Sequence, residues 1–290
     1  MKNPPHNATL RIDFWKRWRA LILGGLVFSA LLLAMNGRPL LAQDAGTTPP
    51  GTVPGGDIFL PIVAQNGPSF RTYDAIPVDR SASPPCQPSE RPAAANADLN
   101  LSLRGYALTD APLTLVDVNG PTDPDAPQAP GLFADRRLPA FTAAYQVYDW
   151  DWSCGPDGCR GPLLTTWPVT LLEMAAAPGE ELSIPSRSAE IYGGGYKALV
   201  LYATADQLTL AYTRHDTAAC GYLVHLEDIA VEPSLVTLYN ELNAAGRTQL
   251  PALHNDEPLG RVNGGSLKIA VRDTGQFMDP RARKDWWQGY

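Results

Sequence analysis

Short runs of alternating apolar and polar residues recur along the chain from Asp98 to its end. This alternation has the period of a half-buried β-strand, in which successive side chains point to opposite faces. Such segments, or short apolar runs bounded by turn residues, are 98–108, 113–120, 141–152, 168–175, 197–203, 207–213, 221–231 and 266–273. Because frequent glycine and proline separate these short strands, we predict a mostly β domain over residues 98–290, a barrel or a sandwich.

One segment has the period of a helix instead. Pro233 suits the first turn of a helix, where its missing N–H would have no partner, and Gly246 suits the stop. The apolar side chains that recur on one helical face between them are Leu235, Leu238, Tyr239 and Leu242. We therefore predict one short helix over about 233–245, packed on the sheet.

The first 42 residues have the order of a secretory signal. Basic residues precede an uninterrupted apolar run of sixteen residues from Ala20 to Met35, and small Ala42 follows at a suitable cleavage point. The run is slightly short for a membrane-spanning helix, which needs about 20 residues. Segment 1–42 is either a cleaved signal peptide or a signal anchor. In both cases we expect a secreted or extracytoplasmic protein that contacts the membrane only through this segment.

Residues 43–97 are rich in proline, glycine and alanine. Such a composition buries too little apolar surface to fold alone. Only residues 58–65, IFLPIVAQ, have the apolar character of a short strand. We predict that 43–97 is a disordered tether with this one strand, between the signal segment and the domain.

The charge balance argues against nucleic acid as a partner. Residues 1–42 hold six of the 23 lysines and arginines and one of the 30 acidic residues, so 17 basic and 29 acidic residues remain, a net charge of −12. Binding to a phosphate backbone needs clustered lysine and arginine, and in this part of the chain such a cluster occurs only at 281–284. We predict no nucleic-acid partner.

Four cysteines, an even number in an exported chain, favour two disulfides. Between Cys154 and Cys159 lies Gly-Pro-Asp-Gly, a tight-turn sequence with proline at its second position. The two cysteines should face each other across the neck of a hairpin. We predict that they pair, which leaves Cys86 to pair with Cys220.

The segment before this hairpin, YQVYDWDW, is the strongest candidate for a binding site. On a strand, one side carries Tyr148, Trp150 and Trp152, and the other carries Val147, Asp149 and Asp151. The aromatic row is either buried in the core with the aspartates facing water, or an exposed platform that stacks on a flat ligand such as a sugar ring. A third interpretation is a calcium loop of Asp149, Asp151 and Asp157, although their spacing is not that of an EF-hand.

Trp286 and Trp287 near the C-terminus are a second aromatic candidate. Adjacent residues of an extended segment point to opposite sides, so at most one packs on the domain through the same face. Either the tail crosses the sheet and one tryptophan plugs the end of the barrel or sandwich, or the tail is mobile. In the second case its tryptophans and the basic residues at 281–284 contact an anionic envelope polymer.

Residues 250–280, LPALHNDEPLGRVNGGSLKIAVRDTGQFMDP, resemble the closing segment of lysostaphin-type zinc endopeptidases. The resemblance covers roughly residues 190–280 and implies a β fold related to these cell-wall peptidases. It does not carry over the zinc site, because Lys268 and Ala270 stand where the family has a histidine pair. The chain from 98 to 287 also resembles uncharacterised secreted bacterial proteins, which implies export but no reaction.

We predict an exported, non-catalytic binding or structural module at the cell envelope that takes no metal or cofactor. Its expected partner is a cell-wall polymer or another glycan. The candidate ligand-binding residues are Tyr148, Trp150, Trp152, Trp286 and Trp287. The alternative is a zinc-dependent, peptidase-like enzyme with an unusual ligand set drawn from His215, Asp216 and His225, which lack the spacing of the usual zinc motifs.

Overall fold

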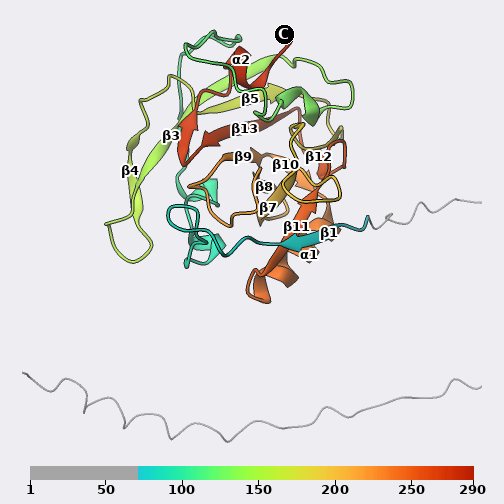
Figure 1. Cartoon of the computed structure of the whole chain (residues 1–290). Helices are drawn as coiled ribbons and strands as arrows, with labels where there is room; N and C mark the ends of the chain where they lie inside the picture. Colours follow the sequence, from blue (N-terminus) through green and yellow to red (C-terminus); the bar gives the residue numbers. More distant parts are fainter. Residues whose placement is uncertain (1–70) are drawn as a thin grey trace, which may run out of the picture. The chain divides into compact units, whose positions relative to one another are not determined.

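The computed structural model describes residues 71–290, and Figure 1 shows them as a β-rich domain with one substantial helix. The predicted signal segment 1–42 and residues 43–70 of the predicted tether lie outside the described residues. The strands are β1 (Asp74–Pro77), β2 (Tyr106–Leu108), β3 (Phe141–Asp151), β4 (Cys159–Leu163), β5 (Leu171–Ala175), β6 (Glu181–Leu182), β7 (Ala198–Ala203), β8 (Gln207–Ala211), β9 (Tyr222–Glu227), β10 (Ile229–Val231), β11 (Gln249–Leu253), β12 (Gly260–Val262), β13 (Ser266–Asp273) and β14 (Gln276–Met278). The α-helices are α1 (Pro233–Ala244) and α2 (Arg283–Trp286), and short 3-10 helices span Ala93–Ala95, Leu101–Leu103 and Ala129–Leu132.

Most of these strands belong to one antiparallel sheet of eleven strands. Its order is β1-β11-β7-β8-β9-β13-β5-β3-β2, with β14 paired to β13 and β4 paired to β3. A second sheet has the order β10-β12-β6. In the described part of the chain β1 and β2 end the large sheet without pairing with each other, so it does not close into a barrel. The prediction of a mostly β domain with one short helix is confirmed.

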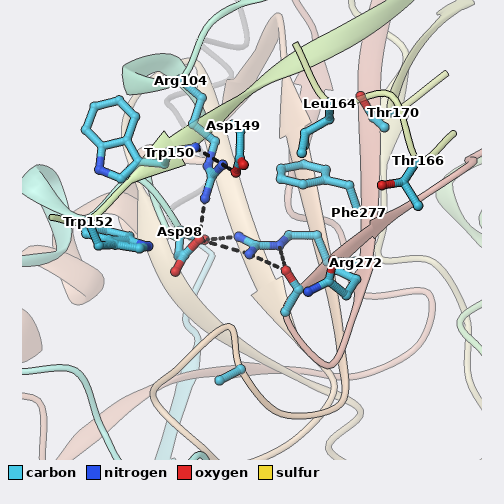
Figure 2. Close-up of a pocket in the computed structure, with 13 residues that line it drawn as sticks. Asp98, Arg104, Asp149, Trp150, Trp152, Leu164, Thr166, Thr170, Arg272 and Phe277 are labelled. Atoms are coloured by element: carbon cyan, nitrogen blue, oxygen red, sulfur yellow. Dashed lines mark hydrogen bonds and ion pairs between the residues drawn. The ribbon is translucent and has the colours of Figure 1, made fainter. Parts of the chain in front are cut away.

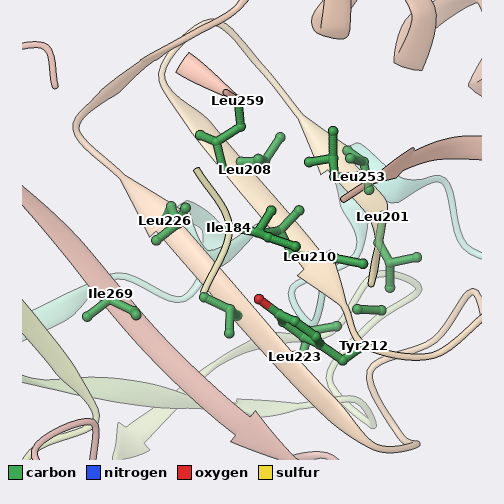
Figure 3. Packing of buried hydrophobic residues seen from close by; sticks show 14 of the residues in the cluster. Ile184, Leu201, Leu208, Leu210, Tyr212, Leu223, Leu226, Leu253, Leu259 and Ile269 are labelled. Carbon is green, nitrogen blue, oxygen red and sulfur yellow. The ribbon is translucent and has the colours of Figure 1, made fainter. Parts of the chain in front are cut away.

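Strand β13 shows how the large sheet divides the molecule. Leu267, Ile269 and Val271 belong to the main apolar core, and Figure 3 shows Ile269 near Leu226 of β9. Lys268 and Arg272 alternate with them and face the other side of the sheet, where they are also buried. That second face carries a smaller apolar cluster, which consists of Leu101, Val147, Leu171, Ala270 and Phe277. The second face therefore mixes apolar packing with buried charge.

Helix α1 confirms the helix predicted from the sequence. Pro233 occupies its first turn, and Gly246 lies just after its end with φ of +92°, a conformation that favours glycine. Leu235 and Tyr239 are buried, and the helix packs against β11 and β7. The predicted apolar face is thus confirmed at Leu235 and Tyr239, whereas Leu238 and Leu242 are only half-buried and Val236 packs against the core.

The folded domain begins earlier than the predicted boundary at residue 98. Residues 74–77 form β1 and pair with β11, and Ile76 is only 2% exposed. Residues 71–97 are therefore part of the domain, and their assignment to a disordered tether was wrong. The segment is held by neighbours that lie far away in sequence, and Pro77 is tolerated because β1 is an edge strand.

Some predicted strands are broken or absent. Residues 98–108 form a 3-10 helix and then β2, with Gly105 between them at φ of +66°. Residues 113–120 make only an isolated bridge between Val116 and Ala282. Residues 221–231 divide at Asp228, where φ is +62°, into β9 of the large sheet and β10 of the small one. Alternation therefore did not by itself predict continuous pairing.

Both predicted disulfides are confirmed. Cys86 pairs with Cys220 across 134 positions, with Cα atoms 5.3 Å apart. Cys154 pairs with Cys159 across the predicted hairpin turn, with Cα atoms 5.5 Å apart. Such bonds persist in oxidising compartments, which agrees with a location outside the cytoplasm. Within residues 71–290, neither α-helix has the length and apolar character needed to cross a bilayer.

Candidate functional site

A cavity of about 240 Å³ opens on the second face of the sheet, beside the β3–β4 hairpin (Figure 2). We call it the first hollow. Its lining comprises Asp98, Arg104, Asp149, Trp150, Trp152, Leu164, Thr166, Thr170, Ala219, Arg272, Gly275, Gln276 and Phe277. These residues come from segments far apart in sequence, so the hollow exists only in the folded domain.

The tryptophans of the predicted aromatic row lie at this hollow. Trp150 and Trp152 are half-buried, and their ring centroids are 6.1 Å apart in an edge-to-face arrangement. Neither belongs to an apolar core cluster of the described residues. The interpretation in which these two tryptophans supply core packing is therefore wrong, and both contribute to the wall of a cavity.

The disulfide-closed hairpin positions Trp150. Its indole Nε1 donates a hydrogen bond of 3.1 Å to the main-chain oxygen of Asp157, in the turn between Cys154 and Cys159. Gly158 has φ of +79°, and a Cβ at this position would overlap Nε1 of Trp150. The turn sequence thus serves both the hairpin and the placement of the ring.

Tyr148, the third residue of the row, does not line the hollow. The guanidinium of Arg160 lies over its ring, 5.0 Å from the centroid. The simple alternation is also interrupted, because the pairing of β3 with β4 shifts register between Tyr148 and Trp150. On the opposite side of the strand, Val147 is buried whereas Asp149 and Asp151 are exposed.

The floor of the hollow carries a buried cluster of charges. Asp98 Oδ1 accepts hydrogen bonds from Arg104 Nη2 at 2.7 Å and lies 2.9 Å from Arg272 Nη2. Both arginine side chains are only 4% exposed, and both guanidiniums lie over the ring of Phe277. Main-chain oxygens hold the guanidiniums further, as Arg272 donates to Gly275 and Arg104 donates to Ala97. The arginines are therefore fixed before any ligand arrives.

Asp98 is held as a carboxylate by this arrangement. Burial acts to raise its pKa, but the nearby guanidiniums of Arg272 and Arg104 outweigh burial and lower the pKa below its ordinary value. Both short arginine contacts use Oδ1, and within residues 71–290 no hydrogen bond reaches Oδ2. The hollow thus offers a fixed acceptor, in a side chain that is 27% exposed.

A second hollow of about 220 Å³ adjoins the first. Its lining comprises Ser89, Arg91, Asn96, Asp98, Trp152, Thr217 and Ala218, so the two hollows share Asp98 and Trp152. The guanidinium of Arg91 lies 4.7 Å from the ring centroid of Trp152. Three of these seven residues, Ser89, Arg91 and Asn96, belong to the segment that was predicted to be a tether.

Trp286 and Trp287 do not form a binding surface. They are 2% and 0% exposed, and their indole nitrogens donate to the main-chain oxygens of Asp279 and Pro280. The tail turns into the short helix α2 instead of remaining extended, so both rings pack inward. The candidate ligand-binding role of this pair, and the expectation that at most one packs on the domain, were wrong.

The alternative zinc ligands are not assembled into a site. Both oxygens of Asp216 accept hydrogen bonds from Arg247, at 2.7 and 2.6 Å. His225 Nδ1 lies 3.0 Å from Thr209 Oγ1, and burial lowers the pKa of His225 well below its usual range, which leaves a neutral ring. Among residues 71–290 no group of three or more histidine, cysteine or acidic side chains is placed to hold a metal, and this includes the aspartates of the calcium interpretation.

Sequence reasoning missed Asp98, Arg104 and Arg272 as site residues. Asp98 and Arg104 belong to one run that was interpreted as strand, 98–108, and Arg272 belongs to another, 266–273. Comparison of the chain with protein-family models, curated proteins and solved structures gives no match. At the position where the lysostaphin-type resemblance expects a zinc ligand, Lys268 forms an ion pair with Asp228.

Proposed function

We propose that this protein is an exported, non-catalytic module that binds a glycan of the cell envelope in the first hollow. The observation that carries the proposal is the meeting of two half-buried tryptophan rings with a fixed aspartate–arginine cluster in one cavity. Small-molecule sites commonly combine an apolar or aromatic lining with a few placed polar groups.

The chemistry of a sugar ring matches these two kinds of group. Its C–H face is apolar and suits the indole rings of Trp150 and Trp152, which offer large contact areas. Its hydroxyls donate and accept hydrogen bonds at the ring edge. The Asp98 carboxylate accepts them, and spare guanidinium N–H groups donate, in charge-assisted bonds that are stronger than neutral ones.

The proposed location supports an envelope polymer as the ligand. The two disulfides agree with an oxidising compartment, and the N-terminal segment is expected to direct export. An exported chain has access to wall polymers and other extracellular glycans. We therefore favour a polysaccharide over a small metabolite.

The state of the Asp98 carboxylate supports a role in binding over a role as a proton donor. A glycoside hydrolase needs one carboxylic acid that stays protonated until it donates its proton to the leaving group. The arginines hold Asp98 ionised, which suits a hydrogen-bond acceptor and not a proton donor. We assign this group to binding.

Retention on insoluble polysaccharides tests the proposal. The purified protein is expected to bind at least one of peptidoglycan, chitin and cellulose, and the Trp152→Ala variant is expected to lose most of this retention. Trp167→Ala is the matched control, because Trp167 is also half-buried but lies outside both hollows. No retention of a folded protein on any of the three polymers would overturn the proposal.

A further inference from the structure

We infer that the two hollows form one elongated groove, and that its ligand is an oligosaccharide of two or more linked units that crosses Asp98 and Trp152. The inference rests on the proposed function and specifies the class of glycan. Its geometric basis is that Asp98 and Trp152 line both cavities. A ligand confined to the first hollow would leave the second without a role.

The sizes of the hollows favour a chain over a single sugar. The first measures about 240 Å³ and the second about 220 Å³. Each alone falls below the roughly 300–1,000 Å³ of small-molecule sites, and the two together lie within that range. A linked pair of sugar units that passes Asp98 would use both volumes.

The second hollow presents two hydroxyl groups whose protons have no acceptor among residues 71–290. Ser89 Oγ accepts hydrogen bonds from the backbone N–H of Arg91 and from Asn96 Nδ2, each at 3.2 Å. Thr217 Oγ1 accepts one from the backbone N–H of Ala219 at 3.2 Å. Each oxygen is thus held in place as an acceptor, and its own O–H remains to donate to a ligand hydroxyl or amide oxygen.

The two disulfides hold opposite walls of this groove. Cys86 lies three positions before Ser89, and its partner Cys220 lies three positions after Thr217, so this bond joins the two segments that carry the hydroxyls. The backbone N–H of Ser89 also donates to the main-chain oxygen of Asp216. Cys154–Cys159 closes the hairpin that carries Trp150 and Trp152. Neither wall depends on the ligand for its position, which reduces the cost of ordering on binding.

The orientation of a bound chain follows from these walls. One unit lies between the tryptophans and the Arg272–Phe277 side of the first hollow, and the next lies between Ser89 and Thr217. Asp98 stands at the junction and accepts hydroxyls from either unit. Figure 2 shows Asp98 between Trp152 and Arg272, as this path requires.

Affinity measured against chain length tests the inference. The probes are soluble chito-oligosaccharides and cello-oligosaccharides of one, two and four sugar units and soluble peptidoglycan fragments of one and two sugar units, titrated calorimetrically into the full exported protein. For at least one series, we expect affinity to rise at least tenfold from the shortest member to the next. Ser89→Ala and Thr217→Ala, made singly and together, should remove most of this gain and leave the affinity for the shortest member unchanged. Trp150, which lines the first hollow alone, provides the contrast, because Trp150→Ala should weaken all lengths.

The outcomes separate this inference from the proposed function. Equal affinity for all lengths of a series that binds, or a double variant that keeps the full gain while folded, would overturn the inference and leave glycan binding intact. Absence of binding by every member of all three series would overturn both. A cooperative thermal unfolding transition establishes that each variant is folded. If the double variant is not folded, the two single variants provide the test.

Discussion

Two pairs of neighbouring tryptophans have opposite roles in this molecule. Trp286 and Trp287 are buried against the main core, where Trp286 lies edge-to-face with Tyr222 and Trp287 packs near Phe141. Trp150 and Trp152 lie on a hairpin and line a cavity. The described side chains give every one of these rings except that of Trp152 an indole hydrogen bond to a main-chain oxygen. An indole hydrogen bond therefore does not separate Trp150 from the buried pair. The two pairs differ in how deeply the rings are buried.

The local chain path explains the difference. A helical turn at α2 brings two adjacent side chains toward the same core, whereas the β3–β4 hairpin extends beyond the body of the sheet, as Figure 1 shows. On this projecting hairpin the rings of Trp150 and Trp152 are only half-buried, although Arg91 lies over the ring of Trp152. Exposed aromatic area beside fixed polar groups is then available to a ligand.

The largest expected effect is on stability, at the C-terminal pair. Trp287→Ala should lower the free energy of unfolding by about 3–5 kcal/mol, because it empties a fully buried site. For a domain of this size, the melting temperature should fall by about 6–20 °C. Thermal and denaturant unfolding measure the change. If Trp287→Ala lost as little free energy of unfolding as Trp152→Ala, the two pairs of tryptophans would not differ in their contribution to stability.

The two disulfides should also differ in how much they contribute to stability, with the larger contribution from the bond that lies outside the hairpin. Removing Cys86–Cys220 by paired serine substitutions should cost about 2–5 kcal/mol, because it frees a long loop that ties the N-terminal segment to the domain. Removing Cys154–Cys159 should cost less, since its loop is short, and should mainly weaken glycan binding by loosening the hairpin. Chemical denaturation and calorimetric titration of the two double variants compare these effects. Equal costs in stability would contradict the assignment.

These contrasts also mark what the sequence could predict. Alternation and turn residues located β3, β5, β7, β8, β9 and β13, the helix α1 and the Cys154–Cys159 pair, because these depend on local pattern. The pairing of Cys86 with Cys220 followed only by elimination, and β4, β6, β11 and β12 were not predicted as strands. The Asp98 cluster could not be predicted, because Arg272 lies far from Asp98 and Arg104 in sequence and meets Asp98 only in the folded domain. Nor could the second hollow, because the proline-rich segment that forms it is held by distant partners and not by its own pattern.

An intermediate effect is expected at Asp98, with a dependence on pH. The folded-state pKa is lower than the unfolded one, so the carboxylate contributes stability above the unfolded value of about 3.9, and this contribution is lost as pH falls through the folded-state pKa. Asp98→Asn should lower stability at pH 7 by about 1–3 kcal/mol, because two buried guanidiniums lose their charge partner. The difference in free energy of unfolding between Asp98→Asn and the parent protein should narrow in unfolding curves measured below about pH 4. A gap that stays constant down to pH 3 would show that the charge is not the cause.

The smallest effect on stability is expected at the hairpin pair. Trp152→Ala should change the free energy of unfolding by less than about 1 kcal/mol, since the ring belongs to no described core cluster. Its glycan affinity should nevertheless fall at least about tenfold, as is typical of aromatic contacts at the centre of a binding site. Trp167→Ala should change neither quantity appreciably. Paired unfolding and binding measurements on the same preparations check both statements, and a large loss of stability in Trp152→Ala would place its ring among the structural residues.

The most direct test of glycan binding at the hairpin follows the indole N–H signals by nuclear magnetic resonance during titration with the oligosaccharides named above. Single Trp→Phe variants assign the signals. The account predicts saturable shifts at Trp150 and Trp152, with the signals of Trp286 and Trp287 unchanged because their N–H groups remain bonded inside the core. Binding detected by calorimetry without any shift at Trp150 or Trp152 would contradict the account.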